Sequence, residues 1–136
     1  MKLFIGGGRS QRCRKTVWKA VKRAGLEPEE ISEVFYGSDI GTDEGVYWYC
    51  RLNKVPQARF DETVYEFLTE EWLDYMRTVM YDCDAIIIIK KHEYDEKGEA
   101  LEAMAIASGK PYSIFDADML NPYAGKWWRP KEQRPE

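Results

Sequence analysis

The feature that most constrains the fold is the apolar run at residues 85–89, an alanine followed by four isoleucines. A continuous run of β-branched side chains is typical of a strand that is covered on both faces, as in the middle of a parallel sheet. The run is far shorter than the roughly 20 apolar residues that a membrane-crossing helix needs. It therefore predicts a parallel sheet with helices on both sides.

Strand-like and helix-like segments alternate along the rest of the chain. Short apolar runs next to glycine or proline predict strands, and apolar residues spaced i, i+3, i+4 and i+7 predict helices. The expected strands are residues 2–5, 33–36, 57–60, 85–89 and 112–115, and the expected helices are residues 17–24, 43–53, 69–80 and 101–108. This alternation predicts an α/β three-layer sandwich with a mostly parallel sheet of about five strands.

Length and charge limit the classes of protein that fit. The 136 residues suit one domain, which we place at residues 1–120, followed by a C-terminal tail at 121–136. The 20 basic and 24 acidic side chains argue against general nucleic-acid binding. Three distant cysteines, Cys13, Cys50 and Cys83, predict neither a disulfide framework nor a zinc site, and they suit a reducing cytoplasm. Residues 1–5 lead directly into three glycines, so we expect no signal peptide.

The segments after the strands are where a parallel sheet binds ligands. The first strand ends in Gly7, Gly8, Arg9 and Ser10. Glycines let the backbone approach a phosphate, and a following helix start offers free N–H groups. The alternative is a tight turn with solvated arginines, because the segment matches neither GxGxxG nor a GK[ST] loop.

Two further segments contain candidate ligand residues. The second strand is followed by Gly37, Ser38, Asp39, Gly41 and Asp43, a glycine-bearing turn into a helix. Asp43 either caps that helix or holds a ribose hydroxyl or braces the first loop. The fourth strand is followed by a helix start with Gly98, Glu99 and Glu102, where acidic residues are otherwise only partners of the helix dipole. Arg77 lies on the helix before that strand, a position that is usually on the surface.

Three separated motifs carry a resemblance to a known family. Residues 7–9 read GGR, residues 34–43 read VFYGSDIGTD, and residues 77–80 read RTVM shortly before CDA at 83–85. In this order they resemble the SLOG superfamily of Rossmann-like proteins, especially its YspA-like branch, which is common in bacteria and phages. The likeness spans roughly residues 2–115, and it implies a Rossmann-like fold that binds nucleotides.

The stretch at residues 95–111 is similar to two enzyme families that act on N-glycosidic bonds. Gly98 and Glu102 keep the GxxxE spacing of lonely-guy phosphoribohydrolases, so Arg77 and Glu102 fall where those enzymes place their catalytic arginine and glutamate. Glu99 replaces a threonine of that motif, and the PGG before it is missing. The same stretch resembles nucleoside 2-deoxyribosyltransferases, in which Glu102 would match the nucleophilic glutamate. Both likenesses imply a nucleoside or nucleotide ligand.

The altered GxxxE loop favours binding over catalysis. We therefore expect a sensor or sequestering module for a nucleotide or nucleotide-derived small molecule. The alternative is an N-glycosidic hydrolase or transferase, in which Glu102 stabilises the sugar cation, activates water or attacks the anomeric carbon, and Arg77 orients phosphate or carboxylate. A third possibility is a purely structural or protein-interaction domain.

The remaining expectations concern partners. No metal or cofactor is expected, since the chain has one histidine, His92, and no ligand cluster. Relatives of this fold usually form dimers, so we expect a homodimer, with four of the five tryptophans as interface residues: Trp48, Trp72, Trp127 and Trp128.

Overall fold

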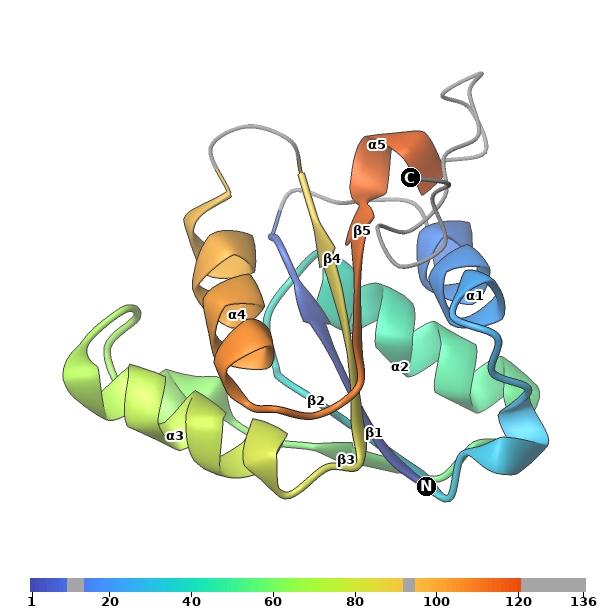
Figure 1. The fold of residues 1–136 in the computed structure, drawn as a ribbon, viewed down its shortest axis with the longest axis horizontal. Coiled ribbons are helices and arrows are strands. Elements are labelled where there is room, and N and C mark those ends of the chain that lie inside the picture. Colours follow the sequence, from blue (N-terminus) through green and yellow to red (C-terminus); the bar gives the residue numbers. More distant parts are fainter. Residues whose placement is uncertain (10–13, 92–94, 121–136) are drawn as a thin grey trace.

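Five parallel strands lie at the centre of the molecule in the order β3-β2-β1-β4-β5 (Figure 1). The computed structural model describes residues 1–9, 14–91 and 95–120. Within these residues the strands are β1 (Lys2–Gly7), β2 (Glu33–Tyr36), β3 (Gln57–Arg59), β4 (Ala85–Lys90) and β5 (Tyr112–Asp116). The predicted α/β fold with a parallel sheet is confirmed, and the strand order is that of a Rossmann-like domain.

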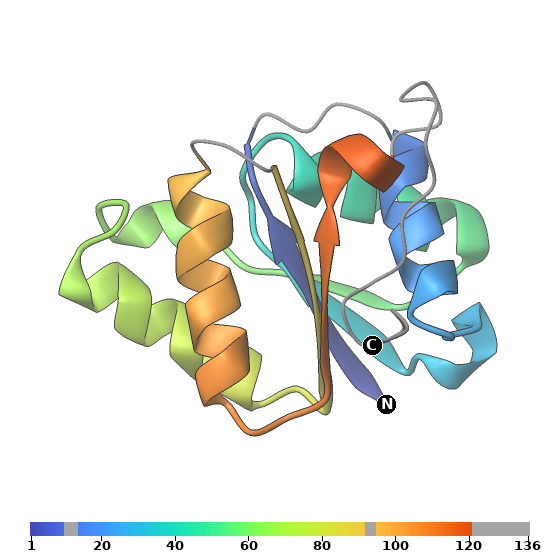
Figure 2. The same ribbon diagram turned by 45° about the horizontal axis from the view of Figure 1, so that its top comes forward.

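Helices cover both faces of the sheet and make it the middle of three layers (Figures 1 and 2). One face carries α1 (Arg14–Arg23), α2 (Thr42–Asn53) and the short α5 (Ala117–Leu120), and the other carries α3 (Glu70–Tyr81) and α4 (Glu96–Ala107). Two single-turn helices, η1 (Pro28–Glu30) and η2 (Glu62–Val64), lie in the connections before β2 and after β3.

The central strands supply side chains to both apolar layers. In β1, Leu3 and Ile5 pack toward α1 and α2, whereas Phe4 packs toward α3 and α4. In β4 the odd-numbered isoleucines join the first layer and the even-numbered ones join the second. This division follows from the alternation of side chains along a strand. It explains why the isoleucine run is continuous, because both faces of β4 are covered.

Most predicted elements form, with changes at their ends. Thr69, the first residue of the helix expected at 69–80, caps α3, since its side chain accepts a hydrogen bond from the N–H of Trp72. β1 continues through two glycines to Gly7, because β4 pairs with it along that length. α4 begins at Glu96, earlier than the apolar spacing suggested, because Asp95 caps it. The helix α5 was not predicted.

Several sequence predictions concern single buried residues or the chain ends. Trp72, predicted at a dimer interface, is 1% exposed and belongs to the core of this chain. Cys50 and Cys83 are buried, and burial raises the pKa of both thiols to about 12. Ser10, Cys13, His92 and the whole tail 121–136 lie outside the described residues. No helix in the described ranges is long and apolar enough to cross a membrane.

Candidate functional site

The carboxyl ends of β1 and β4 lie side by side, with Gly7 paired to Ile89. The next helices lie on opposite faces of the sheet, α1 after β1 and α4 after β4 (Figure 1). In open parallel sheets, ligands bind in the crevice that opens where neighbouring connections diverge in this way. The loops at these strand ends therefore form the candidate site.

The glycines of the first loop are required by the protein's own atoms. A Cβ on Gly7 would lie 1.9 Å from the carbonyl oxygen of Ile89, and a Cβ on Gly8 would lie 2.1 Å from Oδ2 of Asp95. The N–H of Gly8 donates to the carbonyl of Ile89 at 3.1 Å. The loop after β1 is thus held tightly against β4 and the start of α4.

The second loop is bonded directly to the first. Gly41 has a φ of +78°, which favours glycine, and a Cβ there would lie 2.5 Å from the carbonyl oxygen of Arg9. The N–H and the hydroxyl of Thr42 both donate to the carbonyl of Gly8, at 3.2 and 3.1 Å. The structure therefore brings together the segments after β1 and β2 that the sequence singled out.

Asp43 braces the second loop and does not cap α2. The N-cap residue of α2 is Gly41, which has no side chain to bond the helix start. Asp43 is the second residue of the helix, and its Oδ2 accepts the N–H of Asp39 at 3.1 Å. The predicted cap is therefore wrong, and Asp43 bonds its own loop where bracing of the first loop was considered. A contact between Asp43 and a ribose hydroxyl stays a prediction.

A buried ammonium group joins the loops after β2, β3 and β4. Lys97, in the first turn of α4, has a side chain that is 3% exposed. Its Nζ lies 3.0 Å from Asp39 Oδ2, 3.5 Å from Asp43 Oδ2 and 2.8 Å from Glu62 Oε2. Asp43 and Glu62 are also buried. We call these four residues the Lys97 cluster, and it fixes three loops because buried charges need partners.

The protonation states within the Lys97 cluster follow from burial and charge. Burial raises the pKa of Asp43 to about 7, against the attraction of Lys97 and aided by the nearby Glu62. Burial alone would lower the pKa of Lys97, but Asp43 and Glu62 raise it above its usual value. Near neutral pH the lysine is therefore charged, and Asp43 holds a proton in part through its hydrogen bond with Glu62.

Arg9 lies at the outer edge of the Lys97 cluster. Its Nε is 2.6 Å from Asp39 Oδ2, and its guanidinium lies 4.0 Å from the centre of the Phe67 ring. Burial would raise the pKa of Asp39, but the bond to Arg9 and the charge of Lys97 lower it below its usual value. The Arg9 side chain is 48% exposed and that of Asp39 16%, so this pair is open to a ligand.

The other predicted residues of the second loop contact the segment after β3. A Cβ on Gly37 would lie 2.1 Å from Oε1 of Glu62. The hydroxyl of Ser38 accepts the N–H of Glu62 at 3.2 Å and donates to Asp61 at 3.5 Å. These contacts extend the site from the ends of β1 and β2 to the end of β3.

The start of α4 is capped by the chain itself. Asp95 accepts the N–H of Gly98 through Oδ1 at 2.8 Å and the N–H of Lys91 through Oδ2 at 2.9 Å. Glu99 is exposed to solvent. Asp95 thus links Gly98 to the first loop, since a Cβ on Gly8 would also lie 2.1 Å from Asp95 Oδ2.

Arg77 and Glu102 have separate partners. Arg77 is bonded to Asp74 on its own helix at 2.8 Å, and its side chain is 43% exposed. Glu102 pairs with Lys90, at the end of β4, at 2.7 Å, and its side chain is 23% exposed. No ion pair or hydrogen bond joins Arg77 to Glu102 in the described part of the chain. Their joint catalytic role stays a prediction.

Sequence reasoning missed three residues of the site: Lys97, Glu62 and Asp95. Lys97 lies between the strand expected at 85–89 and the helix expected at 101–108, yet it is helical and buried. Charged residues are mostly exposed, so nothing in the local pattern indicated this burial. The sequence does indicate the role of Asp95, because aspartate is a common N-cap residue that accepts the N–H two or three positions later.

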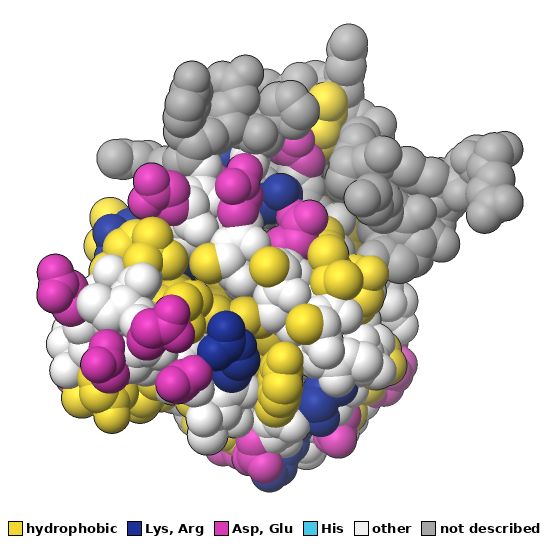
Figure 3. Space-filling view, turned by 60° about the vertical axis from the view of Figure 1, so that its left-hand side comes forward, with side chains coloured by type: hydrophobic (Ala, Val, Ile, Leu, Met, Phe, Trp, Pro, Cys, Tyr) yellow, Lys and Arg dark blue, Asp and Glu magenta, His cyan; other side chains and the backbone are white. Residues whose placement is uncertain are grey.

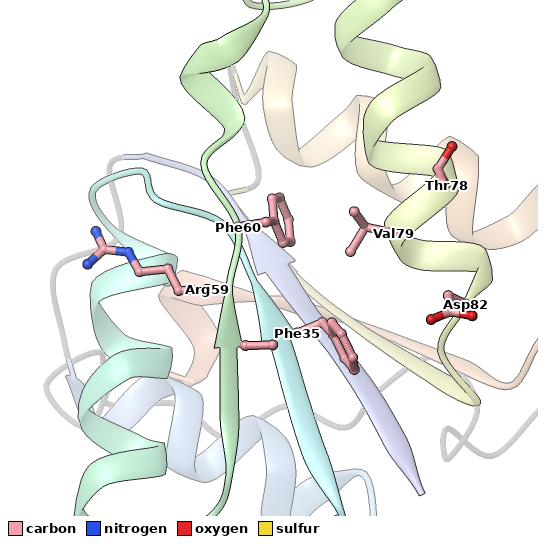
Figure 4. Close-up of a pocket in the computed structure, with 7 residues that line it drawn as sticks. Phe35, Arg59, Phe60, Thr78, Val79 and Asp82 are labelled. Atoms are coloured by element: carbon pink, nitrogen blue, oxygen red, sulfur yellow. The ribbon is translucent and has the colours of Figure 1, made fainter.

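A separate hollow of about 380 Å³ lies between the edge of the sheet and α3 (Figure 4). Phe35, Phe60 and Val79 point into it, and Arg59 points away. It contains none of the residues predicted for the site. The adjoining face of the molecule has acidic side chains with hydrophobic ones exposed between them (Figure 3). The hollow is therefore distinct from the candidate site.

Comparisons with known proteins add no identity. No family model, no curated protein and no solved structure matches this chain. The likeness to the SLOG superfamily therefore stays a prediction from the sequence motifs. Among the described residues, no group of three or more histidine, cysteine, aspartate or glutamate side chains is arranged to hold a metal ion. Function must be argued from the geometry of the strand-end loops.

Proposed function

We propose that the protein binds a nucleotide or nucleotide-derived small molecule at the carboxyl ends of β1, β2 and β4, as a sensor or sequestering module. The observation that supports this most is the chain of contacts from Arg9 through Asp39 to Lys97, which joins residues from all three strand ends. These contacts lie at the point of the sheet where ligands of α/β proteins bind. A connected polar group there is well placed to hold a ligand rigidly.

Two features favour binding over catalysis. The helix start that phosphoribohydrolases use to hold phosphate is capped here by Asp95, which bonds the N–H of Gly98. Glu99 is turned to solvent, so it contributes no group to the interior of the site. With the start of α4 capped in this way, the site can bind a nucleotide without cleaving its N-glycosidic bond.

The test is retention of ligand by the full chain. Concentrated protein is mixed with nucleosides, mono- and dinucleotides and cyclic nucleotides, filtered, and every species in the filtrate is quantified. We expect at least one compound to be retained and recovered intact when the protein is denatured. Arg9→Ala should weaken retention about tenfold or more, because it removes an exposed cation that pairs with Asp39. Arg51→Ala, on the surface of α2, is the matched control. Passage of the whole panel would contradict the proposal.

A second candidate is hydrolysis or transfer at the N-glycosidic bond. It is favoured by the position of Glu102, which is partly exposed and paired with Lys90 at the carboxyl end of β4. A carboxylate in such a place can stabilise a sugar cation or attack its anomeric carbon. The same filtrate decides the matter, since a free base that disappears in Glu102→Ala establishes this chemistry. Retention without any free base excludes it.

We also propose that the protein forms a homodimer. Exposed aromatic side chains on α1 and α2, Trp18 and Trp48, support an interface on that layer, since aromatic residues are enriched in interfaces. Light scattering coupled to gel filtration measures the mass directly. A mass of one chain, 16.0 kDa, at all concentrations would contradict a dimer.

A further inference from the structure

We propose that the hollow between the edge of the sheet and α3 is a second binding site, which takes an uncharged aromatic molecule of two fused rings. The residues that line the hollow are all different from those of the candidate site, so the proposal goes beyond the proposed function and does not rest on it. Three observations support it: the volume of the hollow, its aromatic wall, and the partners of the charged groups around it.

The hollow is large enough for a small molecule and open enough for one to enter. Its volume is about 380 Å³. Ligand pockets usually measure roughly 300 to 1,000 Å³, and an apolar cavity of about 150 Å³ holds one benzene molecule. Phe35, Ala58 and Val79 are only half-buried, so water reaches the walls from outside. The space therefore fits two fused rings, which can enter without any opening of the fold.

Aromatic rings form the wall on the side of the sheet. Phe35 and Phe60 point into the hollow from β2 and from the end of β3, and Val79 points into it from α3 (Figure 4). The ring of Phe60 is held in place, because its centre lies 6.2 Å from that of Phe4 and 5.8 Å from that of Tyr75. Rings at such separations attract one another beyond what burial alone contributes. A flat aromatic ligand would extend this row of rings.

The charged side chains that line the hollow have partners in the protein. Arg59 points away from the hollow, and its guanidinium donates to the carbonyl of Ser38 at 3.4 Å (Figure 4). The carboxylate of Asp82 lies 3.5 Å from Nζ of Lys2, and both side chains are exposed. A charge that is buried against apolar walls without a partner is costly. The part of the ligand that enters the hollow is therefore uncharged.

The surface beyond the rim gives a charged ligand no advantage either. Residues 61–84 contain eight acidic side chains and one basic one, Arg77, so an anion would be repelled. A cation would reach Asp74 and Asp82, but these exposed carboxylates already pair with Arg77 and Lys2. Exposed ion pairs contribute little, because water and salt screen them. Neither sign of charge is therefore selected.

The experiment locates binding on the full chain by nuclear magnetic resonance of the backbone amides. The protein is titrated with quinoline at slightly alkaline pH, where this two-ring aromatic compound is uncharged. We expect saturable shifts at Phe35, Ala58, Phe60 and Val79, with a dissociation constant of about 1 mM or lower. Shifts confined to the loops after β1, β2 and β4, or the absence of saturable shifts, would overturn the proposal. Neither result changes the test of nucleotide retention.

Three matched compounds test the class of ligand. N-methylquinolinium has a positively charged ring system, quinoline-2-carboxylate adds a negative charge, and decahydro-2-naphthol has two fused rings that are neutral but saturated. We expect both ions to bind about tenfold or more weakly than quinoline, and the saturated alcohol about threefold or more weakly. An ion that binds as tightly as quinoline would overturn the uncharged class. Equal binding of the saturated alcohol would overturn the aromatic class.

Two substitutions test the position of the site. Val79→Trp fills the hollow from α3, and Thr78→Trp, on the exposed side of the same turn, covers its opening with less risk to the fold. Each should weaken quinoline binding about tenfold or more. Ile106→Trp is the matched control, because Ile106 is 53% exposed on α4. Circular dichroism shows which variants are folded. Unchanged binding in the folded variants at 78 and 79 would place quinoline elsewhere and overturn the proposal.

Discussion

Two lysines at opposite ends of the sheet show how much surroundings change the meaning of an ion pair. Lys2, at the amino end of β1, lies 3.5 Å from Asp82, and both side chains are exposed, at 45% and 69%. Lys97, at the carboxyl end, contacts three carboxylates and is 3% exposed. Water can replace the partner of Lys2, whereas Lys97 is nearly closed to water and depends on the three carboxylates around it. This difference in burial predicts that the ion pairs of Lys97 stabilise the fold, whereas the ion pair of Lys2 contributes little to stability.

Lys97→Met should have the largest effect. The substitution keeps an apolar stem and leaves Asp43 and Glu62 buried with no cation between them. Loss of one partner of a buried ion pair is expected to lower the free energy of unfolding by about 3 to 5 kcal/mol. Chemical denaturation measures it. Lys2→Met is the matched control, and equal losses in both variants would show that burial of the cluster has no energetic consequence.

The titration of Asp43 should make the stability of the protein depend on pH. Its folded pKa, raised to about 7 by burial, exceeds the usual value of 3.8. The folded state therefore binds more protons between these pH values, and this contribution is lost as the pH rises through 7. The loss should reach about 2 to 4 kcal/mol between pH 4 and pH 8.

Asp43→Asn mimics the protonated acid and should flatten that profile. Calorimetry at several pH values compares it with the unsubstituted protein. Asp39 acts in the opposite direction, since its lowered pKa gives stability that disappears as the pH falls below about 4. A slope that persists unchanged between pH 5 and pH 8 in Asp43→Asn would assign the titration to another group.

Gly8→Ala should have a moderate effect. The added methyl would lie 2.1 Å from Asp95 Oδ2, so the cap of α4 must move. Overpacking of this kind lowers stability by about 1 to 3 kcal/mol. The same substitution in an Asp95→Ala background should be milder, because the clash is then absent. If Gly8→Ala lowers the free energy of unfolding equally with and without Asp95→Ala, the clash with Asp95 is not the cause.

Asp82→Ala should have the smallest effect. Exposed ion pairs contribute about 0 to 1 kcal/mol, and salt screens them. We expect a change in the free energy of unfolding of less than about 1 kcal/mol, smaller still at high salt. If Asp82→Ala lowers the free energy of unfolding nearly as much as Lys97→Met, the two ends of the sheet do not differ in the way proposed.

The fold could be predicted because its signals are local. Each local signal indicates one element: the isoleucine run, the apolar spacing of the helices and the cap at Thr69. Together they predict a parallel sheet with helices on both faces. The segments after β1 and β2 could also be predicted to meet, because carboxyl ends of parallel strands share one edge. The contact between Thr42 and Gly8 confirms that expectation.

The interior of the site could not be predicted in the same way. Lys97 lies 35 to 58 residues from its three partners in the sequence. No local pattern indicates that a lysine in a charged stretch will be buried among distant acids. Glu62 likewise lies between the strand expected at 57–60 and the helix expected at 69–80. It is buried against Gly37 and Lys97, which belong to other parts of the chain. The burial of Lys97 and Glu62 therefore depends on tertiary contacts between segments that are distant in the sequence.

The separation between Lys97 and its partners has a consequence for biosynthesis. A chain that is still being translated exposes Asp39, Asp43 and Glu62 before the lysine has been made. At 5 to 20 residues per second, Lys97 is added several seconds after Asp39, roughly 60 residues later. Until then the acidic loops lack the ammonium group that holds them together in the folded protein. The ligand site of this protein is therefore completed late, once the ribosome has delivered β4 and α4.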